Sequence, residues 1–142
     1  MARKLCITAV DGQTGFLIAE LILKHRGFSR KIDSLVGLSL HPQSDRAKEL
    51  RSLGATIVHH VPGRELFMVK TLKDTGCDTL CLVPPTHEEK YEISVELVHA
   101  TKKANIQNVL LISSVGCDYT NAKNQPRLRE FIDIEKLALE AK

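Results

Sequence analysis

The chain has 142 residues, 43% of them hydrophobic and 26% charged, which is typical of a globular domain able to bury roughly 68% of its unfolded surface. Its net charge of +3 comes from basic residues scattered among acids, which argues against a nucleic-acid-binding arm. The four cysteines form no CxxC pair and the apolar runs are too short to span a bilayer, so we expect one domain over 1–142, with reduced thiols, no metal site, no membrane segment and a cytoplasmic location.

Short apolar runs alternate along the chain with segments of helical period, which predicts parallel strands joined by crossover helices. The expected strands are Lys4–Val10, Ser34–Leu40, Ala55–Val61, Thr79–Val83 and Asn108–Val115. The expected helices cover about 14–25, 44–54, 63–76, 86–105 and 128 to the end of the chain. Right-handed crossovers between them predict an α/β fold: a three-layer, Rossmann-like, doubly wound parallel sheet of five strands in the order 3-2-1-4-5.

Two of the expected helices carry further signals. The helix over 14–25 is apolar nearly all round, a pattern typical of a buried helix. Thr86 and Glu89 have the spacing of a capping box, which predicts that the fourth helix begins there.

The first strand-to-helix turn carries a glycine pattern. It reads Thr8-Ala9-Val10-Asp11-Gly12-Gln13-Thr14-Gly15. It lies where the strand order reverses, and there a helix N-terminus and close-approaching glycines can hold a pyrophosphate. Gly12 and Gly15 fit the second and third glycines of the fingerprint, whereas Val10 or Ala9 stands at the first. Ala9 is the milder loss where its backbone angles are ordinary. The alternative is that both glycines only permit a sharp turn and close helix packing.

The end of the second strand bears on the choice of cofactor. An acid there would bind a ribose hydroxyl, and a base would accept a 2′-phosphate. The sequence has no acid at this tip, but His41 and Arg46 could face a 2′-phosphate, which favours NADP. For Arg46, at a helix start, a plain solvated surface role stays open.

Longer segments share the pattern of a known family. They are "KLCITAVDGQTGFLIAELIL", "LRSLGATIV", "DTLCLVPPTHEEKYEISVELVHATKKANIQNVLLISSVGCD" and "QPRLREFIDIE". Together they resemble the NmrA-like branch of the atypical short-chain dehydrogenase/reductases. The resemblance implies a Rossmann fold that binds NAD(P), often NADP; some members are reductases of specialised metabolism, and others act through protein partners. By position it implies cofactor contacts from Ala9 to Thr14, near His41, and from Val83, Pro84 and Pro85.

The chain departs from the family pattern at three positions. The usual first glycine is Ala9, the usual Arg at the second strand tip is Leu40, and the usual Asp after the third strand falls in His60-Val61-Pro62. Losing two charge-assisted hydrogen bonds of about 1.5–3 kcal/mol each would weaken binding on the order of a hundredfold or more, so we expect weak cofactor affinity. Family members also continue past the last helix, so we expect resemblance to their N-terminal half only, truncated relative to the family.

Candidates for catalysis are few. Tyr119 and Lys123 have the YxxxK spacing of short-chain reductases, and Ser113 and Ser114 lie at the end of the fifth strand. The segment "GCDYTNAKNQPR" is rich in loop formers, so Tyr119 and Lys123 need not share a helix face, and we assign no catalytic residue.

A histidine pair offers no metal site either. His59 and His60 are consecutive in an expected strand, so they point to opposite faces and cannot bind one metal together. We expect one of them to be packed and the other exposed.

Three functions remain open. The first is a dinucleotide-binding module that acts as a redox sensor or binds a protein partner. The second is an NAD(P)-dependent reductase whose site needs another chain, and the third is a truncated, inactive relative. Free sheet edges and the last helix also predict self-association through that helix and its neighbouring strand.

Overall fold

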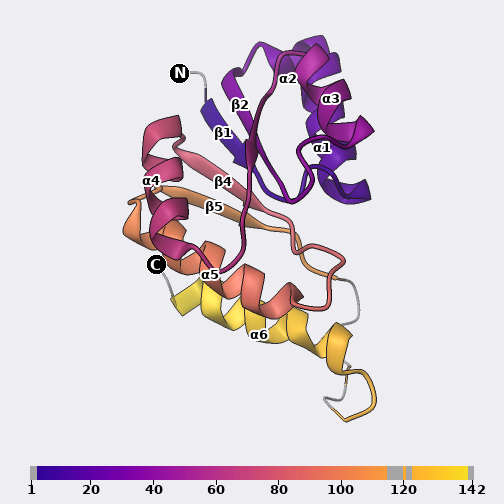
Figure 1. Cartoon of the computed structure of the whole chain (residues 1–142), viewed down its shortest axis with the longest axis vertical. Helices are drawn as coiled ribbons and strands as arrows, with labels where there is room; N and C mark the ends of the chain where they lie inside the picture. Colours follow the sequence, from indigo (N-terminus) through magenta and orange to yellow (C-terminus); the bar gives the residue numbers. More distant parts are fainter. Residues whose placement is uncertain (1–2, 115–119, 121–122, 141–142) are drawn as a thin grey trace.

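A computed structural model describes residues 3–114, 120 and 123–140 of the chain. Its sheet has five strands: β1 (Arg3–Ile7), β2 (Ile32–Ser39), β3 (Thr56–His59), β4 (Thr79–Leu82) and β5 (Asn108–Leu111). All pairings are parallel, and the strands lie in the predicted order, β3-β2-β1-β4-β5 (Figure 1). The strand order reverses between β1 and β4, so their carboxyl ends border the crevice where such sheets bind ligands.

Helices cover both faces of this sheet. They are α1 (Gln13–Lys24), α2 (Arg26–Ser29), α3 (Asp45–Ser52), α4 (Glu65–Thr75), α5 (Lys90–Lys103) and α6 (Pro126–Glu140). Figure 1 shows α1, α2 and α3 against one face and α4, α5 and α6 against the other. These are the three layers of the predicted Rossmann-like fold. The short α2 was not predicted, because four residues carry too little periodicity to be recognised.

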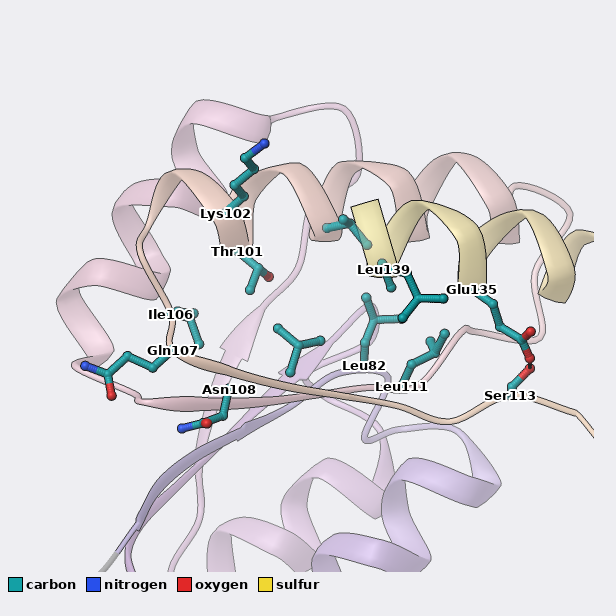
Figure 2. A pocket seen from close by; sticks show the side chains of 13 residues that line it. Leu82, Thr101, Lys102, Ile106, Gln107, Asn108, Leu111, Ser113, Glu135 and Leu139 are labelled. Atoms are coloured by element: carbon teal, nitrogen blue, oxygen red, sulfur yellow. Dashed lines mark hydrogen bonds between the residues drawn. The ribbon is translucent and has the colours of Figure 1, made fainter. Parts of the chain in front are cut away.

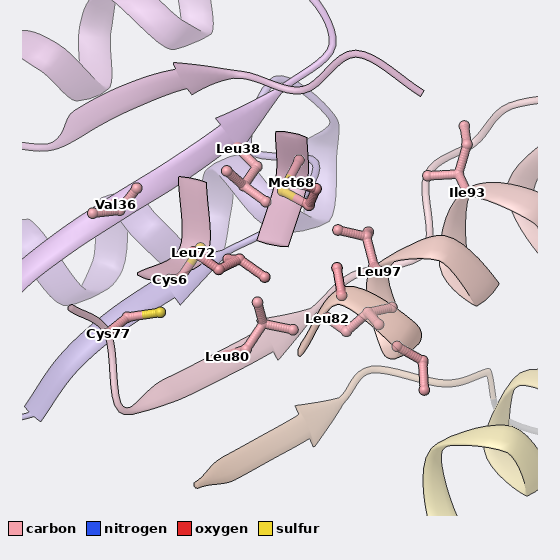
Figure 3. Packing of buried hydrophobic residues seen from close by; sticks show 12 residues of the cluster. Cys6, Val36, Leu38, Met68, Leu72, Cys77, Leu80, Leu82, Ile93 and Leu97 are labelled. Carbon is pink, nitrogen blue, oxygen red and sulfur yellow. The ribbon is translucent and has the colours of Figure 1, made fainter. Parts of the chain in front are cut away.

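The core consists of two clusters, one on each face of the sheet. Alternate residues of β1 divide between them: Leu5 and Ile7 pack with the cluster that includes Ala19 of α1, and Cys6 packs with the cluster that includes Leu72 of α4. Figure 3 shows this second cluster, in which residues of β2 and β4 pack against α4 and α5 on one face of the sheet. Because β1 is covered on both faces, its sequence reads as a continuous apolar run.

The prediction that the first helix is buried all round is wrong. Gly15 and Ala19 of α1 are buried, whereas Leu17 and Leu21 are 52% and 55% exposed. A helix in the outer layer of a three-layer fold meets the sheet along one side only. Here that side carries the buried Gly15 and Ala19 together with the partly buried Phe16, Ile18, Ile22 and Leu23. Leu17 and Leu21 therefore form an apolar strip on the outer side of α1.

Several predicted element ends also move. β1 ends at Ile7, earlier than Val10, and β5 ends at Leu111. The predicted capping box is wrong, because α5 begins only at Lys90 and no side chain caps it. The Pro85 carbonyl accepts the His87 N–H at 3.0 Å, and this turn delays the start of the helix. Within the described residues, no helix is long and apolar enough to cross a bilayer.

Candidate functional site

Thr8, directly after β1, fastens the carboxyl ends of β1 and β4 together. Its buried hydroxyl donates to the Val83 carbonyl at 3.1 Å and accepts from the Val83 N–H at 2.7 Å. The Thr8 N–H donates to the Cys81 carbonyl at 3.0 Å. The rim of the crevice is therefore held by hydrogen bonds from both strands.

The glycine turn then folds back on Ala9. Ala9 has a φ of 52°, in the left-handed region that favours glycine, so the condition under which Ala9 would be the milder loss is not met. A side chain in this conformation costs roughly 1–2 kcal/mol. The Gly12 N–H donates to the Ala9 carbonyl at 3.0 Å, and a Cβ on Gly15 would lie 2.3 Å from that same oxygen. Only glycine fits at position 15, and the missing first glycine is at the position that needs positive φ.

Helix α1 opens at this turn without a side-chain cap. Its N-cap residue, Gly12, has no side chain, and the first turn contains no acid. The Phe16 N–H is bonded back to the Gly12 carbonyl at 3.0 Å. The N–H groups of Gln13 and Thr14, both exposed, precede that bond and have no carbonyl within the helix to accept them. An uncapped helix N-terminus of this kind suits an anion, and this part of the site fits a diphosphate.

Asp11 lies against the end of β2, where the sequence itself has no acid. Its Oδ1 accepts the Leu40 N–H at 3.3 Å, and its main-chain carbonyl accepts Nη1 of Arg46 at 3.3 Å. The Arg46 guanidinium also lies 5.8 Å from the centre of the Phe16 ring. His41, at the tip, is exposed. Sequence reasoning missed Asp11 at this tip because residues 11 and 40 are far apart in the chain.

His60 lies at the carboxyl end of β3 and is 3% exposed, whereas His59 is exposed, as predicted. Burial lowers the pKa of His60 to about 4, with a smaller contribution from His59 and an opposing one from Asp11. Its Nε2 lies 3.8 Å from Oε1 of Glu96, and neither atom has a hydrogen-bond partner among the described residues. At neutral pH the imidazole is therefore uncharged, and its Nε2 can form a hydrogen bond with a ligand.

Several predicted residues meet at a shallow depression that has no room for a water molecule. It is lined by Thr8, Ala9, Leu40, His60, Val83, Pro85, Ile93 and Leu97. The structure therefore brings Ala9 of the first turn together with Val83 and Pro85 of the β4 end. Pro84 is partly exposed beside them.

A larger cavity lies elsewhere. It measures about 650 Å³ and is bounded by β5, α5 and α6 (Figure 2). Leu82, Leu111 and Leu139 supply apolar walls, and Ser113 donates to Oε1 of Glu135 at 2.5 Å on its rim. None of the predicted cofactor residues lines this cavity. Its size alone therefore does not connect it to the glycine turn.

The predicted catalytic candidates are only partly visible. Tyr119 lies outside the described residues, so whether it shares a helix face with Lys123 stays a matter of prediction. Lys123 is exposed ahead of α6, and Ser114 is partly exposed after β5. Among the residues that the structure describes, no group of three or more His, Cys, Asp or Glu side chains could hold a metal ion.

Solved structures with the same fold are oxidoreductases and related enzymes. The chain is similar to a triphenylmethane reductase from Citrobacter sp. complexed with NADP(H), with a TM-score of 0.77 and 15% identity over 97% of this chain and 46% of that one. It is similar to an NADPH-dependent quinone oxidoreductase from Escherichia coli complexed with NADPH, with a TM-score of 0.77 and 22% identity over 96% and 45%. It is also similar to the enzyme WbmH from Bordetella bronchiseptica in complex with NAD+, with a TM-score of 0.72 and 16% identity over 99% of this chain and 53% of that one. The chain therefore has the Rossmann-like fold of NAD(P)-binding reductases.

Sequence comparison narrows this class. An NmrA-like family domain-containing protein from Dictyostelium discoideum is 25% identical over 144 residues, which cover 96% of this chain and 45% of that protein. No family model matches the chain. The predicted resemblance to NmrA-like proteins is confirmed, and the chain spans about half the length of the proteins it matches.

Proposed function

We propose that the chain is an NmrA-like NAD(P)-binding module, with the turn from Ala9 to Gly15 as the diphosphate site. The observation that carries the proposal is the uncapped N-terminus of α1 at the reversal of strand order. The N–H groups of Gln13 and Thr14 would bind the diphosphate. The similar proteins crystallised with NADP(H) or NAD+ support the same cofactor class.

The remaining contacts follow from the crevice. Val83, Pro84 and Pro85 follow β4 on one side, and Leu40 and His60 bound the side of β2 and β3. A bound nicotinamide ring would supply or accept hydride. This chain's own residues would position the dinucleotide, and the left-handed Ala9 is a reason to expect weak affinity.

We propose a sensor or partner-binding role rather than catalysis. In support, Ser113 donates its hydrogen to Glu135, and Lys123 is exposed. A reductase whose site is completed by another chain is the alternative, and hydride transfer from NADPH or NADH to a panel of carbonyl and enone compounds separates the two. Measurable turnover would favour the reductase. We also propose a cytoplasmic location, on the ground that Cys6, Cys77 and Cys81 are free thiols.

The binding site is tested by removing one amide hydrogen. Gln13 is the first residue of α1, where proline is well tolerated, and Gly12 before it has φ −84° and ψ 166°, which suit a residue preceding proline. Gln13→Pro should weaken dinucleotide binding about tenfold or more in isothermal titration calorimetry, because one N–H to the diphosphate is lost. Gln13→Ala keeps that N–H and should bind like the parent chain.

Two outcomes would contradict the proposal. Equal binding by Gln13→Pro and Gln13→Ala would show that the diphosphate does not bind to the Gln13 N–H of this turn. No heat with NADH or NADPH at millimolar concentration would leave the chain as an inactive relative whose sheet survives without a ligand.

Self-association is a separate proposal and concerns the edge of the sheet formed by β5. Val109 and Leu110 of β5 are 49% and 57% exposed, and Leu139 of α6 is 63% exposed beside the large cavity. β5 pairs only with β4 among the described strands, so its outer side can accept a second copy of this chain. Light scattering should detect a dimer, and a monomer throughout the micromolar range would contradict the proposal.

A further inference from the structure

We propose that Asp11 supplies the acidic group that the end of β2 lacks, and that the site therefore prefers NAD(H) over NADP(H). This inference rests on the proposed dinucleotide site. The sequence favoured NADP through His41 and Arg46. The geometry around Asp11 points the other way.

Asp11 is held in place through its side chain and through its main chain. Its Oδ1 accepts the Leu40 N–H at 3.3 Å, directly beyond β2, and its main-chain carbonyl accepts Nη1 of Arg46 at 3.3 Å. Asp11 is partly buried. In Rossmann-like sheets the adenosine ribose binds over this strand end, and an acid there bonds the 2′-hydroxyl. A residue from the glycine turn thus stands where the acid usually comes from β2 itself.

The basic side chains around Asp11 form no salt bridge with its carboxylate among the described residues. No ion pair within 4.0 Å joins Asp11 to a basic residue in the part of the chain that the structure describes. Arg46 points its guanidinium at the Asp11 main-chain oxygen and the Phe16 ring. Exposed His59 and His41 lie in solvent, and buried His60, with a pKa of about 4, is uncharged at neutral pH.

The chemistry of the two cofactors then differs at one group. The ribose hydroxyls of NAD(H) can donate to a carboxylate. The 2′-phosphate of NADP(H) carries about −1.5 to −2 charge and is repelled by a nearby carboxylate. When it is fully ionised it has no hydrogen to donate and can only accept hydrogen bonds. Leu40, at the position where the family places an arginine, offers no compensating charge.

The test is calorimetric titration of the chain with NADH and NADPH, and of the variants Asp11→Asn and Arg46→Gln. Asparagine keeps an oxygen for the Leu40 N–H and removes only the charge. We expect the parent chain to bind NADH about tenfold more tightly than NADPH, and Asp11→Asn to lose that preference by strengthening NADPH binding. Arg46→Gln should leave the ratio of NADH affinity to NADPH affinity unchanged, because the Arg46 guanidinium bonds to the main chain of the turn and not to the cofactor.

Shorter probes locate the effect on the adenosine half. Adenosine 2′,5′-bisphosphate and 5′-AMP differ only in the 2′-phosphate, and the parent chain should bind 5′-AMP more tightly, with the difference lost in Asp11→Asn. Circular dichroism and thermal unfolding confirm that each variant is folded.

The outcomes separate this inference from the proposed function. A parent chain that binds NADPH more tightly, with the ratio unchanged in Asp11→Asn, overturns the role of Asp11 and leaves the dinucleotide site standing. A selective loss of NADPH binding in Arg46→Gln also overturns it, because Arg46 would then contact the 2′-phosphate. No binding of any probe overturns the site and the inference together.

Discussion

The crevice at the end of β1 and the edge at β5 belong to one sheet but differ in how tightly they are fastened. At the crevice, Thr8 and Ala9 bond to β4 and to the following turn, and Gly15 packs on the Ala9 carbonyl. At the edge, Val109 and Leu110 are about half exposed beside a large cavity. A central strand is paired on both sides and covered on both faces, whereas an edge strand has neither constraint. Substitutions should therefore affect folding at the crevice and association at the edge.

The largest loss of stability is expected from Gly15→Ala. The new Cβ would lie 2.3 Å from the Ala9 carbonyl oxygen, a backbone atom that cannot move alone. We expect the free energy of unfolding to fall by about 3 kcal/mol, measured by urea denaturation. Gly27→Ala is the control, because its Cβ would meet only the His25 side chain at 3.1 Å. Equal losses in the two variants would show that the turn is not tightly packed.

Acid should weaken the crevice through His60. Its pKa is about 4 in the folded chain and 6.5 in its ordinary state, so the unfolded chain binds more protons between these values. The contribution of neutral His60 is present above pH 6.5 and is lost as the pH falls through 4, on the order of 3 kcal/mol in total. The variant His60→Gln should flatten the dependence of unfolding free energy on pH across this window. His59→Gln, at the exposed neighbour, should leave it unchanged, and a change of equal size would contradict the assignment.

Thr8→Val tests the bridge between β1 and β4. Valine has nearly the same shape but leaves the buried Val83 N–H without the acceptor that now lies at 2.7 Å. We expect a loss of about 2 kcal/mol in the free energy of unfolding. Thr56→Val, at an exposed position of β3, should change it by less than about 0.5 kcal/mol. If the Thr8 hydrogen bonds do not stabilise the fold, both variants will show the same small change in the free energy of unfolding.

Ala9→Gly should act in the opposite direction. Glycine relieves the left-handed strain of about 1–2 kcal/mol but adds freedom to the unfolded chain, so we expect a net gain of about 0.5–1 kcal/mol. It should also strengthen dinucleotide binding in calorimetry, because the first fingerprint glycine is restored. The matched control is the partly buried Ala104, which closes α5 at φ −81°. Ala104→Gly should destabilise.

The smallest effect on stability is expected at the edge. Leu110→Lys places a charge on an exposed position of β5, so we expect less than about 0.5 kcal/mol in unfolding but loss of the dimer in light scattering. Leu66→Lys, at a 79% exposed position of α4, should leave association unchanged. Dimers that persist in Leu110→Lys would place the interface elsewhere.

Much of the fold could be predicted from local pattern. The alternation of apolar runs with helical segments fixed the order of the sheet, because right-handed crossovers leave few arrangements for such a chain. Element ends depend on more than local pattern: α5 starts at Lys90 because of a turn after Pro85 that no cap signal reveals. The burial of α1 was misjudged because the sequence shows how apolar a helix is, not how much of it the sheet reaches.

The sequence by itself determined the glycine turn, its place between the first strand and helix, and the family that the chain resembles, since these depend on neighbouring residues and local spacing. Only the tertiary structure decided that Ala9 is left-handed, that Val109 and Leu110 are about half exposed on the predicted edge strand, and that Asp11 reaches the end of β2. Each of these depends on which strands become neighbours, a property that no single segment carries.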